Sequence, residues 1–183
     1  MSSGLGLDKD VVRLMPHDQR WIALGKRECE IVTRLLGETA RDVVHVGSTS
    51  VPGIEAKPIL DIAAAVDDDA PIDDLVARLC AGGEYIYEGD KREDGGLLFV
   101  RGHGTFRTVH VHVVGANTEA WSSYLRFRML LMEDLAARDR YESEKRRLAR
   151  KYPNDRAGYT KAKSPVIEEL LGAEGAGRGA HES

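Results

Sequence analysis

The strongest constraint on the fold is an almost uninterrupted apolar run at residues 59–66. It reads Ile-Leu-Asp-Ile-Ala-Ala-Ala-Val, so Asp61 is its only polar residue. Such a run is typical of a strand that is covered on both faces of its sheet. A second β-rich run, residues 42–46, ends directly before Gly47 and Ser48. The sequence therefore predicts a strand, a Gly-Ser turn and then a second, buried strand.

Helices are expected before, between and after the strands. Apolar residues recur at helical spacing after Asp18, which can cap the first helix, and Gly37 stops it. Further helices are predicted over residues 71–82, from about 118 onward with breaks near 136 and 153, and over 158–171. Three more strands are predicted, over residues 84–88, 96–101 and 106–114. We therefore expect an α/β or α+β domain: a mixed, mostly antiparallel sheet with flanking helices and C-terminal helices.

The composition fits one globular domain and excludes several other classes of protein. Of the 183 residues, 42% are hydrophobic and 31% are charged. We expect a single domain over residues 1–172 and a disordered, Gly- and Ala-rich tail over residues 173–183. No run approaches the ~18 apolar residues of a membrane span, and the N-terminus shows no signal-peptide pattern. Cys29 and Cys80 form no CxxC motif, so we expect a reduced, cytoplasmic protein without a membrane partner.

The charge is spread unevenly along the chain. The net charge is -4, yet residues 138–163 hold ten basic and four acidic residues. Such a segment predicts a local anionic partner, and the alternative is a solvated helix face. The negative net charge, an aromatic content of 6% and the lack of a recognisable motif argue against nucleic acid as a partner. We therefore expect a small-molecule substrate and leave the oligomeric state open.

The Gly-Ser turn and Asp61 form the first candidate site. A glycine directly after a strand lets a phosphate or another part of the backbone approach closely. Serine and threonine hydroxyls beside free N–H groups can hold phosphate oxygens. Asp61 in an apolar strand needs a donor, a cation or a metal, because an unpaired carboxylate there is costly. A divalent ion that bridges Asp61 and a triphosphate satisfies both features, whereas the alternative is a tight turn with Asp61 paired to Lys or Arg.

Two histidines form the second candidate site. His110 and His112 are two residues apart on a predicted strand, so their side chains point to the same face. If that strand lies near the strand of Asp61, these imidazoles and His45 converge on the carboxylate. Imidazoles suit Zn, Mn, Ni or Fe better than Mg. Alternatively, one histidine is a general base, or both are hydrogen-bonded on a half-exposed face.

Several segments together resemble a known family. The sequence from His45 to Ile62 closely resembles the signature of the GrpB-like family, and the resemblance continues through three shorter segments, 109–114, 125–128 and 159–164. It spans roughly Val12 to Leu171. The family looks like a branch of the nucleotidyltransferase (DNA polymerase β-like) superfold, so the resemblance implies a nucleotidyltransferase-like fold. Transfer of a nucleotidyl group is implied only by analogy, since fold does not determine function.

The signature of that superfold is a Gly-Ser pair, then Asp-x-Asp or Asp-x-Glu on the next strand, then a third carboxylate. Gly47, Ser48 and Asp61 match it, but Ala63 stands where the second carboxylate is expected and cannot bind a metal. Chemistry with two metal ions needs several negative ligands. The resemblance therefore implies a differently built metal centre, with Asp61, His110 and His112 as the catalytic and metal-binding residues. The expected ion is Mg²⁺ or Mn²⁺, or else Zn²⁺.

The resemblance also implies a set of residues that bind the phosphates of ATP or another nucleoside triphosphate: Gly47, Ser48, Thr49, Ser50, Lys57, Arg128 and Lys161. The family usually has an acidic residue after this arginine, whereas this chain has Met129. The expected function is transfer of a nucleotidyl group to a small acceptor. A carboxylate acceptor would yield an acyl adenylate, which an amine could capture to form an amide. The alternatives are a nucleotide or phospho-metabolite binding module without activity, and a histidine- and metal-dependent hydrolase or isomerase.

Overall fold

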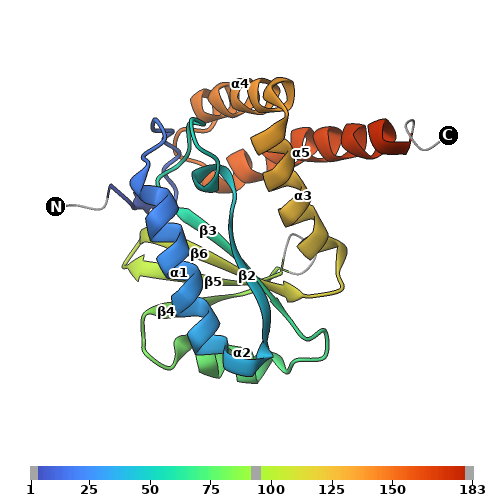
Figure 1. Ribbon diagram of the computed structural model, residues 1–183. Helices are drawn as coiled ribbons and strands as arrows, with labels where there is room; N and C mark the ends of the chain where they lie inside the picture. Colours follow the sequence, from blue (N-terminus) through green and yellow to red (C-terminus); the bar gives the residue numbers. More distant parts are fainter. Residues whose placement is uncertain (1–3, 92–95, 180–183) are drawn as a thin grey trace.

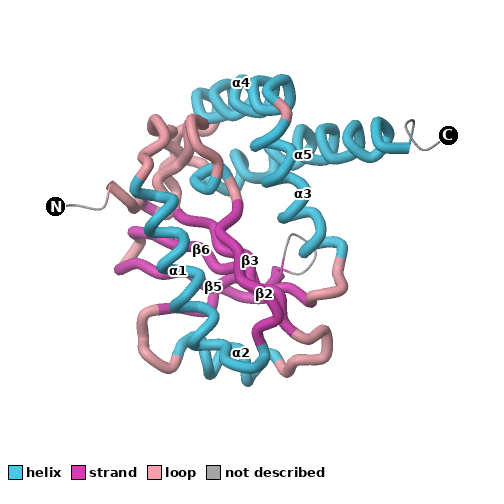
Figure 2. The backbone as a smooth tube through the Cα atoms, in the orientation of Figure 1, coloured by secondary structure: helices cyan, strands magenta, loops and turns pink. Residues whose placement is uncertain are grey.

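The protein is a six-stranded sheet with helices packed on both of its sides (Figures 1 and 2). A computed structural model describes residues 4–91 and 96–179. The strands are β1 (Leu7–Asp8), β2 (Ala40–Val46), β3 (Leu60–Val66), β4 (Tyr85–Lys91), β5 (Gly96–His103) and β6 (Phe106–Gly115). Their order is β2-β3-β6-β5-β4, and the short β1 pairs with β6. Only β3 and β6 run parallel to each other. The predicted mixed, mostly antiparallel sheet is therefore confirmed.

The described residues form five α-helices, which pack around this sheet. They are α1 (Arg20–Leu36), α2 (Ile72–Cys80), α3 (Glu119–Glu133), α4 (Leu135–Lys151) and α5 (Arg156–Gly179). Two short 3-10 helices lie at Gly37–Thr39 and Ser48–Ser50. Gly37 ends α1 as predicted, because its φ of 61° breaks the helical backbone. No helix in residues 4–91 and 96–179 is long and apolar enough to cross a membrane.

The main core lies between the sheet and α1 and α2. Alternate residues of β3 and β6 face this core, including Leu60, Ile62, Val109 and Val111. They pack against apolar residues of the two helices, including Trp21, Leu36 and Leu75. Between Leu60 and Val66 every residue except Asp61 is buried, so the predicted strand with two covered faces is confirmed. A second cluster joins α3, α4 and α5 to the segment after the Gly-Ser turn through Val51, Ile54, Leu131, Tyr141 and Val166.

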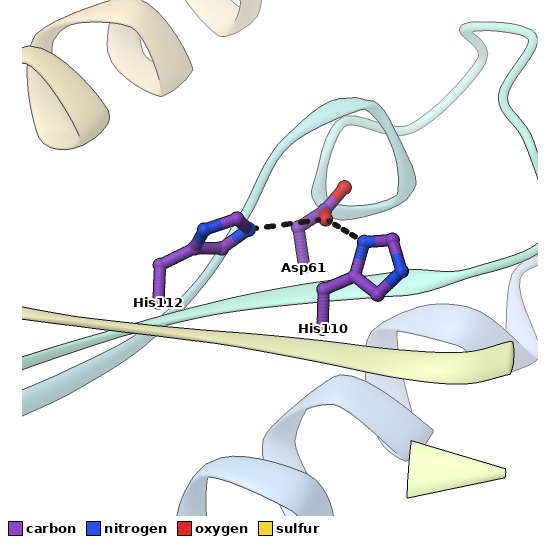
Figure 3. Close-up of side chains that lie close together, drawn as sticks. All are labelled: Asp61, His110 and His112. Carbon is purple, nitrogen blue, oxygen red and sulfur yellow. Dashed lines mark ion pairs between the residues drawn. The ribbon is translucent and has the colours of Figure 1, made fainter. Parts of the chain in front are cut away.

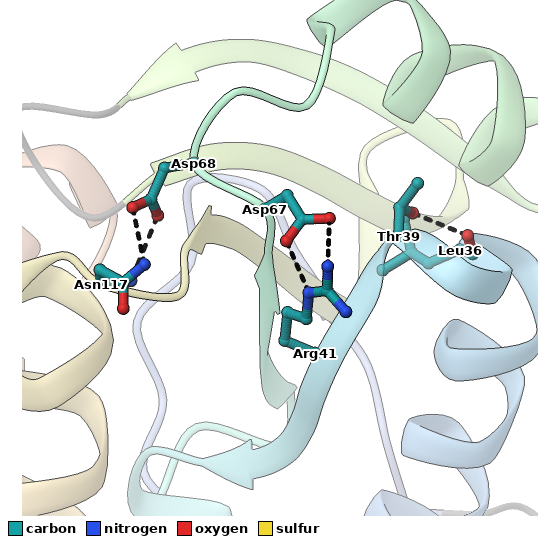
Figure 4. A network of polar contacts seen from close by, with 6 residues as sticks. All are labelled: Leu36, Thr39, Arg41, Asp67, Asp68 and Asn117. Carbon is teal, nitrogen blue, oxygen red and sulfur yellow. Dashed lines mark hydrogen bonds and ion pairs between the residues drawn. The ribbon is translucent and has the colours of Figure 1, made fainter.

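Two aspartates hold the end of β3 in place (Figure 4). The carboxylate of Asp67 accepts two hydrogen bonds from the Arg41 guanidinium on β2, at 2.5 and 2.7 Å. Asp68 accepts bonds from the backbone and the side chain of Asn117, just before α3, at 3.2 and 3.0 Å. These contacts join β3 to both of its neighbours in the acidic turn after the strand.

The structure differs from the prediction at the C-terminal helix. We predicted an end at Leu171, because Gly172 often stops a helix, but α5 continues to Gly179. Gly172 does not adopt the positive φ that ends α1 at Gly37, so the helical backbone passes through it. The disordered tail over 173–183 stays a prediction, and residues 180–183 lie outside the described residues. The single domain over 1–172 stays a prediction.

Candidate functional site

Asp61, His110 and His112 converge on one face of the sheet (Figure 3). The parallel register places Asp61 opposite His110, and Ala63 opposite His112. His110 Nδ1 lies 3.4 Å, and His112 Nε2 3.5 Å, from the same carboxylate oxygen, Asp61 Oδ1. The three ligand atoms all lie within 4.8 Å of one another. Pairing of β3 with β6 therefore produces the convergence that the sequence suggested for these three residues.

The protonation states of this cluster suit a metal ligand set. Burial by itself would raise the pKa of Asp61, but hydrogen bonds from His110 and His112 outweigh burial and hold this pKa well below its usual range. Burial lowers the pKa of His110, against the opposing effect of Asp61. At neutral pH the carboxylate is therefore ionised and the His110 imidazole is neutral. The side chains of Asp61, His110 and His112 keep 34%, 18% and 22% of their surface exposed, so a small solute can reach them.

The spacing of the ligand atoms fits a divalent ion. Two ligands at about 2.1 Å from a tetrahedral ion stand about 3.4 Å apart. The observed separations of 3.4 and 3.5 Å from Asp61 Oδ1 match this value. The residues present therefore fit an ion with three protein ligands and a position left for a substrate.

The third histidine does not join the cluster. His45 pairs with Ile62 across β2 and β3, so its side chain points to the face opposite Asp61. There its ring packs against Gly25 of α1, and Nε2 lies 2.9 Å from the Thr49 hydroxyl. Burial lowers the pKa of His45 to about 4, so the ring is neutral. The expectation that three imidazoles converge is therefore wrong, because adjacent positions on a strand point to opposite faces.

Gly47 brings the turn directly over Asp61. Its φ is 68°, a conformation that other residues rarely adopt, and a Cβ atom built there would lie 2.8 Å from Asp61 Oδ2. Glycine is therefore required at position 47 for two independent reasons. The backbone has a positive φ, and a side chain would collide with the Asp61 carboxylate.

The three hydroxyl groups after Gly47 have different surroundings. Thr49 and Ser50 are buried, and their hydroxyls contact His45 and the Gly47 carbonyl oxygen, which Ser50 Oγ approaches to 2.7 Å. Ser48 is half-buried, and Lys145 Nζ donates to its Oγ at 3.1 Å. Of these three side chains, only that of Ser48 is placed to meet a ligand, so any phosphate contact by Thr49 or Ser50 would use the backbone.

Three lysines gather beside the turn around two tyrosine rings. Lys57 Nζ lies 5.2 Å from the centre of the Tyr159 ring, and Lys163 Nζ lies 5.5 Å from the same ring. Lys145 and Lys163 lie 4.8 and 6.0 Å from the centre of the Tyr141 ring. Burial lowers the pKa of Lys57 to about 7 against an opposing effect of the Asp61 charge, and the same charge is among the causes that raise the pKa of Lys163. Both lysines are therefore near the carboxylate. The metal-ligand cluster and the lysines therefore flank the same turn.

Two further residues that the resemblance predicts as phosphate contacts, Lys161 and Arg128, lie on α5 and α3. Lys161 is exposed on α5, whereas Lys163 faces the tyrosines. Two residues turn an α-helix by about 200°, so these two side chains leave opposite sides of α5. Arg128 lies on α3 near His45, whose pKa its charge lowers in addition to the effect of burial. Its buried Nε has no hydrogen-bond partner in the described part of the chain.

Four residues at or beside the site were not identified from the sequence: Lys145, Tyr124, Tyr141 and Tyr159. Lys145 belongs to the basic segment that we expected to be either solvated or bound to an anion, and its charge alone could not distinguish the two. The Tyr124 ring stacks at 5.4 Å from the His112 ring, and burial, followed by the charge of Asp61, raises its pKa. Only the packing of α3, α4 and α5 brings these side chains to the turn.

Comparison with known proteins finds relatives along nearly the whole chain. The family model described as GrpB protein matches residues 11–173. The glutamate-rich protein GrpB of Alkalihalophilus pseudofirmus is 31% identical over 170 residues, which cover 91% of this chain and 98% of that protein. A UPF0157 protein of Streptomyces coelicolor is 41% identical over 167 residues, which cover 91% of this chain and 86% of that protein.

A solved structure has the same fold. The crystal structure of the conserved protein GrpB from Enterococcus faecalis superimposes with a TM-score of 0.75 at 28% sequence identity. The match covers 88% of this chain and 99% of that one. It supports the α+β fold described above over the matched part of the chain.

Proposed function

Because this chain belongs to the GrpB protein family, whose signature surrounds Gly47 and Asp61, we propose that it is a metal-dependent nucleotidyltransferase. It would use a nucleoside triphosphate and a small-molecule acceptor. The observation that carries this proposal is the position of the Asp61, His110 and His112 ligand atoms directly beneath a Gly-Ser turn. A cation held there would lie next to a turn and lysines suited to phosphate.

Each residue of the site has a specific role in this reaction. A bound divalent ion would polarise the phosphoryl oxygens and offset their charge. Asp61, His110 and His112 would hold that ion. Gly47 lets the phosphate approach the backbone, the Ser48 hydroxyl donates to a phosphate oxygen, and Lys57 balances the charge of the phosphates.

The reaction itself is a displacement at the α-phosphorus. An acceptor oxygen forms a bond to that phosphorus, the bond to the bridging oxygen of the β-phosphate breaks, and pyrophosphate leaves. The proton of a hydroxyl acceptor is released to water. A carboxylate acceptor has no proton to lose and yields an acyl adenylate. An amine can then attack the acyl carbon, which breaks its bond to the phosphate oxygen, so that AMP leaves, a proton of the amine passes to water and an amide forms.

Binding of α,β-methylene ATP tests the proposal without knowledge of the acceptor. We expect calorimetry of the full chain to show binding with Mn²⁺, Mg²⁺ or Zn²⁺ present and at least tenfold weaker binding after chelation. The Asp61→Asn variant should lose the part of the affinity for α,β-methylene ATP that depends on the metal. Asp67→Asn is the matched control, because Asp67 lies in the turn directly after the same strand and pairs with Arg41. No binding of the analogue with any of the three ions would overturn the proposal.

Ala63 favours a second candidate, a binding module without activity. Ala63 is fully buried beside His112, so this position offers neither a second carboxylate nor room for another ligand. A single ion would then position the nucleotide without a second ion to activate the acceptor. Pyrophosphate release from ATP, measured with pools of hydroxyl, carboxylate and amine acceptors, separates the candidates. Tight binding with no release from any pool supports the module.

A histidine- and metal-dependent hydrolase is a different outcome of the same measurements. Tetrahedral spacing of the ligand atoms suits Zn²⁺, which generates a nucleophilic hydroxide from bound water in many hydrolases. Stoichiometric Zn²⁺ binding that depends on His112, together with no affinity for nucleotides, would favour this activity over nucleotidyl transfer.

A further inference from the structure

The three lysines beside the turn come from separate parts of the chain. Lys57 precedes β3, Lys145 belongs to α4, and Lys163 belongs to α5. The Tyr159 ring is shared by Lys57 and Lys163, and the Tyr141 ring is shared by Lys145 and Lys163. Lys145 is 2% exposed, and the other two are half-buried. The fold therefore concentrates three ammonium groups in a small, largely enclosed volume.

Carboxylates do not neutralise this cluster. In the described parts of the chain, none of the three ammonium groups forms an ion pair with a carboxylate. The two acidic side chains closest to Lys145 are already bound to Arg146, Glu55 at 2.7 Å and Glu142 at 3.6 Å. Lys145 instead donates to the Glu55 carbonyl oxygen and to the Ser48 hydroxyl. Buried charges are normally paired, so this arrangement is incomplete without an anion.

The pKa values support the same conclusion. Burial, followed by the charge of Lys163, lowers the pKa of Lys57 and of Lys145 to about 7. Burial by itself would lower the pKa of Lys163, but the phenol oxygens of Tyr141 and Tyr159 and the carboxylate of Asp61 together raise it. Lys163 therefore stays charged, while the two lysines around it are only partly protonated at neutral pH. An anion of high charge would favour the protonated form of all three.

We propose that Lys57, Lys145 and Lys163 form a subsite for a pyrophosphate group. This inference rests on the proposed function, because it assigns the β- and γ-phosphates of the triphosphate, and the pyrophosphate product, to the lysines. The α-phosphate then lies over the Gly-Ser turn beside Asp61. Lys145 joins the two parts of the site, since its ammonium group bonds to the Ser48 hydroxyl at 3.1 Å. Lysine ammonium groups bind phosphate as point charges and do not require a planar partner.

Titration of the full chain with inorganic pyrophosphate, without any metal or nucleotide, tests the subsite. We expect calorimetry at low salt to show one binding event per chain. Lys163→Met should weaken it at least tenfold, and Lys163→Arg should retain most of it. Lys151→Met is the matched control, because Lys151 is an exposed lysine on the same helix as Lys145 and contacts Tyr152 instead. The affinity of the Lys151→Met variant for pyrophosphate should be unchanged.

Two results would overturn the inference. One is the absence of pyrophosphate binding, and the other is binding that is equally strong in Lys163→Met and Lys151→Met. A thermal melt of each variant shows whether it is folded. If Lys163→Met does not fold, Lys57→Met replaces it, because Lys57 is half-buried and lies on a different segment.

Failure of the subsite and failure of the proposed function give different results. If α,β-methylene ATP binds with metal but pyrophosphate affinity does not depend on the lysines, the subsite is wrong and the proposed function stands. If pyrophosphate binds through the lysines but no nucleotide binds with any metal, the lysines form an anion site and the proposed function is wrong.

Discussion

Gly47 shows how one residue connects the backbone to the candidate site. The φ of 68° would strain any other residue, and a Cβ atom would meet Asp61 Oδ2 at 2.8 Å. Gly53 provides a natural comparison within the same segment. Its φ is 83°, but the nearest atom to its built Cβ, the Arg138 Nη1, lies 3.9 Å away. The two positions therefore share the backbone strain and differ in the contact with the carboxylate.

We predict that Gly47→Ala loses metal binding whereas Gly53→Ala keeps it. Both variants should be destabilised by about 1–3 kcal/mol, the usual cost of placing another residue in such a conformation. Only Gly47→Ala also pushes the Asp61 carboxylate out of its position. Urea unfolding measures the stability of each variant, and calorimetric titration with Zn²⁺ measures the metal site. Equal Zn²⁺ affinity in both variants would show that Gly47 does not position Asp61.

Lys145 makes the stability of the protein depend on pH. Its pKa is about 7 in the folded protein, against the ordinary lysine value of 10.5 in an unfolded chain, so between these values the unfolded chain binds more protons. The free energy of unfolding contributed by this residue therefore rises with pH across that window, by up to ~1.4 kcal/mol per pH unit. Residues that face Lys145 and also carry charge are Lys163, Glu142, Glu55 and Arg146.

We predict that Lys145→Met is more stable than the wild type at pH 7 and that this advantage shrinks toward pH 10. Urea unfolding at pH 7, 8, 9 and 10 measures the difference between the two proteins at each pH. The exposed Lys151→Met should follow the wild-type pH profile. A difference between Lys145→Met and wild type that stays constant across this range would show that Lys145 is protonated in the folded protein throughout.

At the scale of elements, α1 packs closely against the His45 ring of β2. A Cβ atom at Gly25 would lie only 2.1 Å from His45 Nδ1, so the helix can pack this closely only with glycine at that position. The β2–β3 register places His45 on this face of the sheet, and the close approach of α1 then covers its ring. Gly172 in α5 is also a helical glycine, but a Cβ atom there would have open space around it, with no atom within 4 Å.

We therefore predict opposite effects from the same substitution in two helices. Gly25→Ala should cost about 1–3 kcal/mol, because it overpacks the contact between α1 and His45. Gly172→Ala should stabilise the helix by up to about 1 kcal/mol, because alanine has the higher helix propensity. Chemical denaturation of both variants measures these changes. Destabilisation of similar size in both would mean that loss of glycine itself, and not the contact with His45, is responsible.

At the scale of the whole molecule, the site lies where the sheet meets the C-terminal helices. β3 and β6 supply the metal-ligand cluster, and α4 and α5 supply Lys145 and Lys163. The segment after Gly47 connects the two parts, since Glu142 on α4 accepts the Glu55 backbone N–H at 2.8 Å. A ligand bound across both parts therefore stabilises the folded chain as a unit.

We predict that Zn²⁺ or Mn²⁺ raises the melting temperature, with ~1.4 kcal/mol of added stability for each tenfold rise in free metal above the dissociation constant. Metal binding stabilises the folded protein because the three ligands are brought together only in the folded chain. Differential scanning calorimetry across a metal series measures the shift. His112→Gln should abolish most of it, while His103→Gln, on β5 outside the cluster, should not. An equal shift in both variants would mean that the metal binds elsewhere.

Several properties could be predicted from the sequence alone because they are set by local patterns. Periodicity and glycine spacing placed five of the six strands and the succession of helices, and the apolar run around Asp61 identified the buried strand. The spacing of His110 and His112 placed both imidazoles on one face. The two-residue β1 was missed, since so short a segment has no period, and Gly172 misled the prediction of the last helix end.

Other properties were decided only by the tertiary structure. Which strand lies beside β3 determines whether Asp61 meets the histidines, and this depends on pairing between segments about fifty residues apart. Which side of α5 faces the sheet selects Lys163 over Lys161, and the register of β2 against β3 places His45 on the face opposite the cluster. The physical reason is that hydrophobic periodicity specifies which face of an element is buried, whereas the partners of a polar side chain depend on how separate elements pack together.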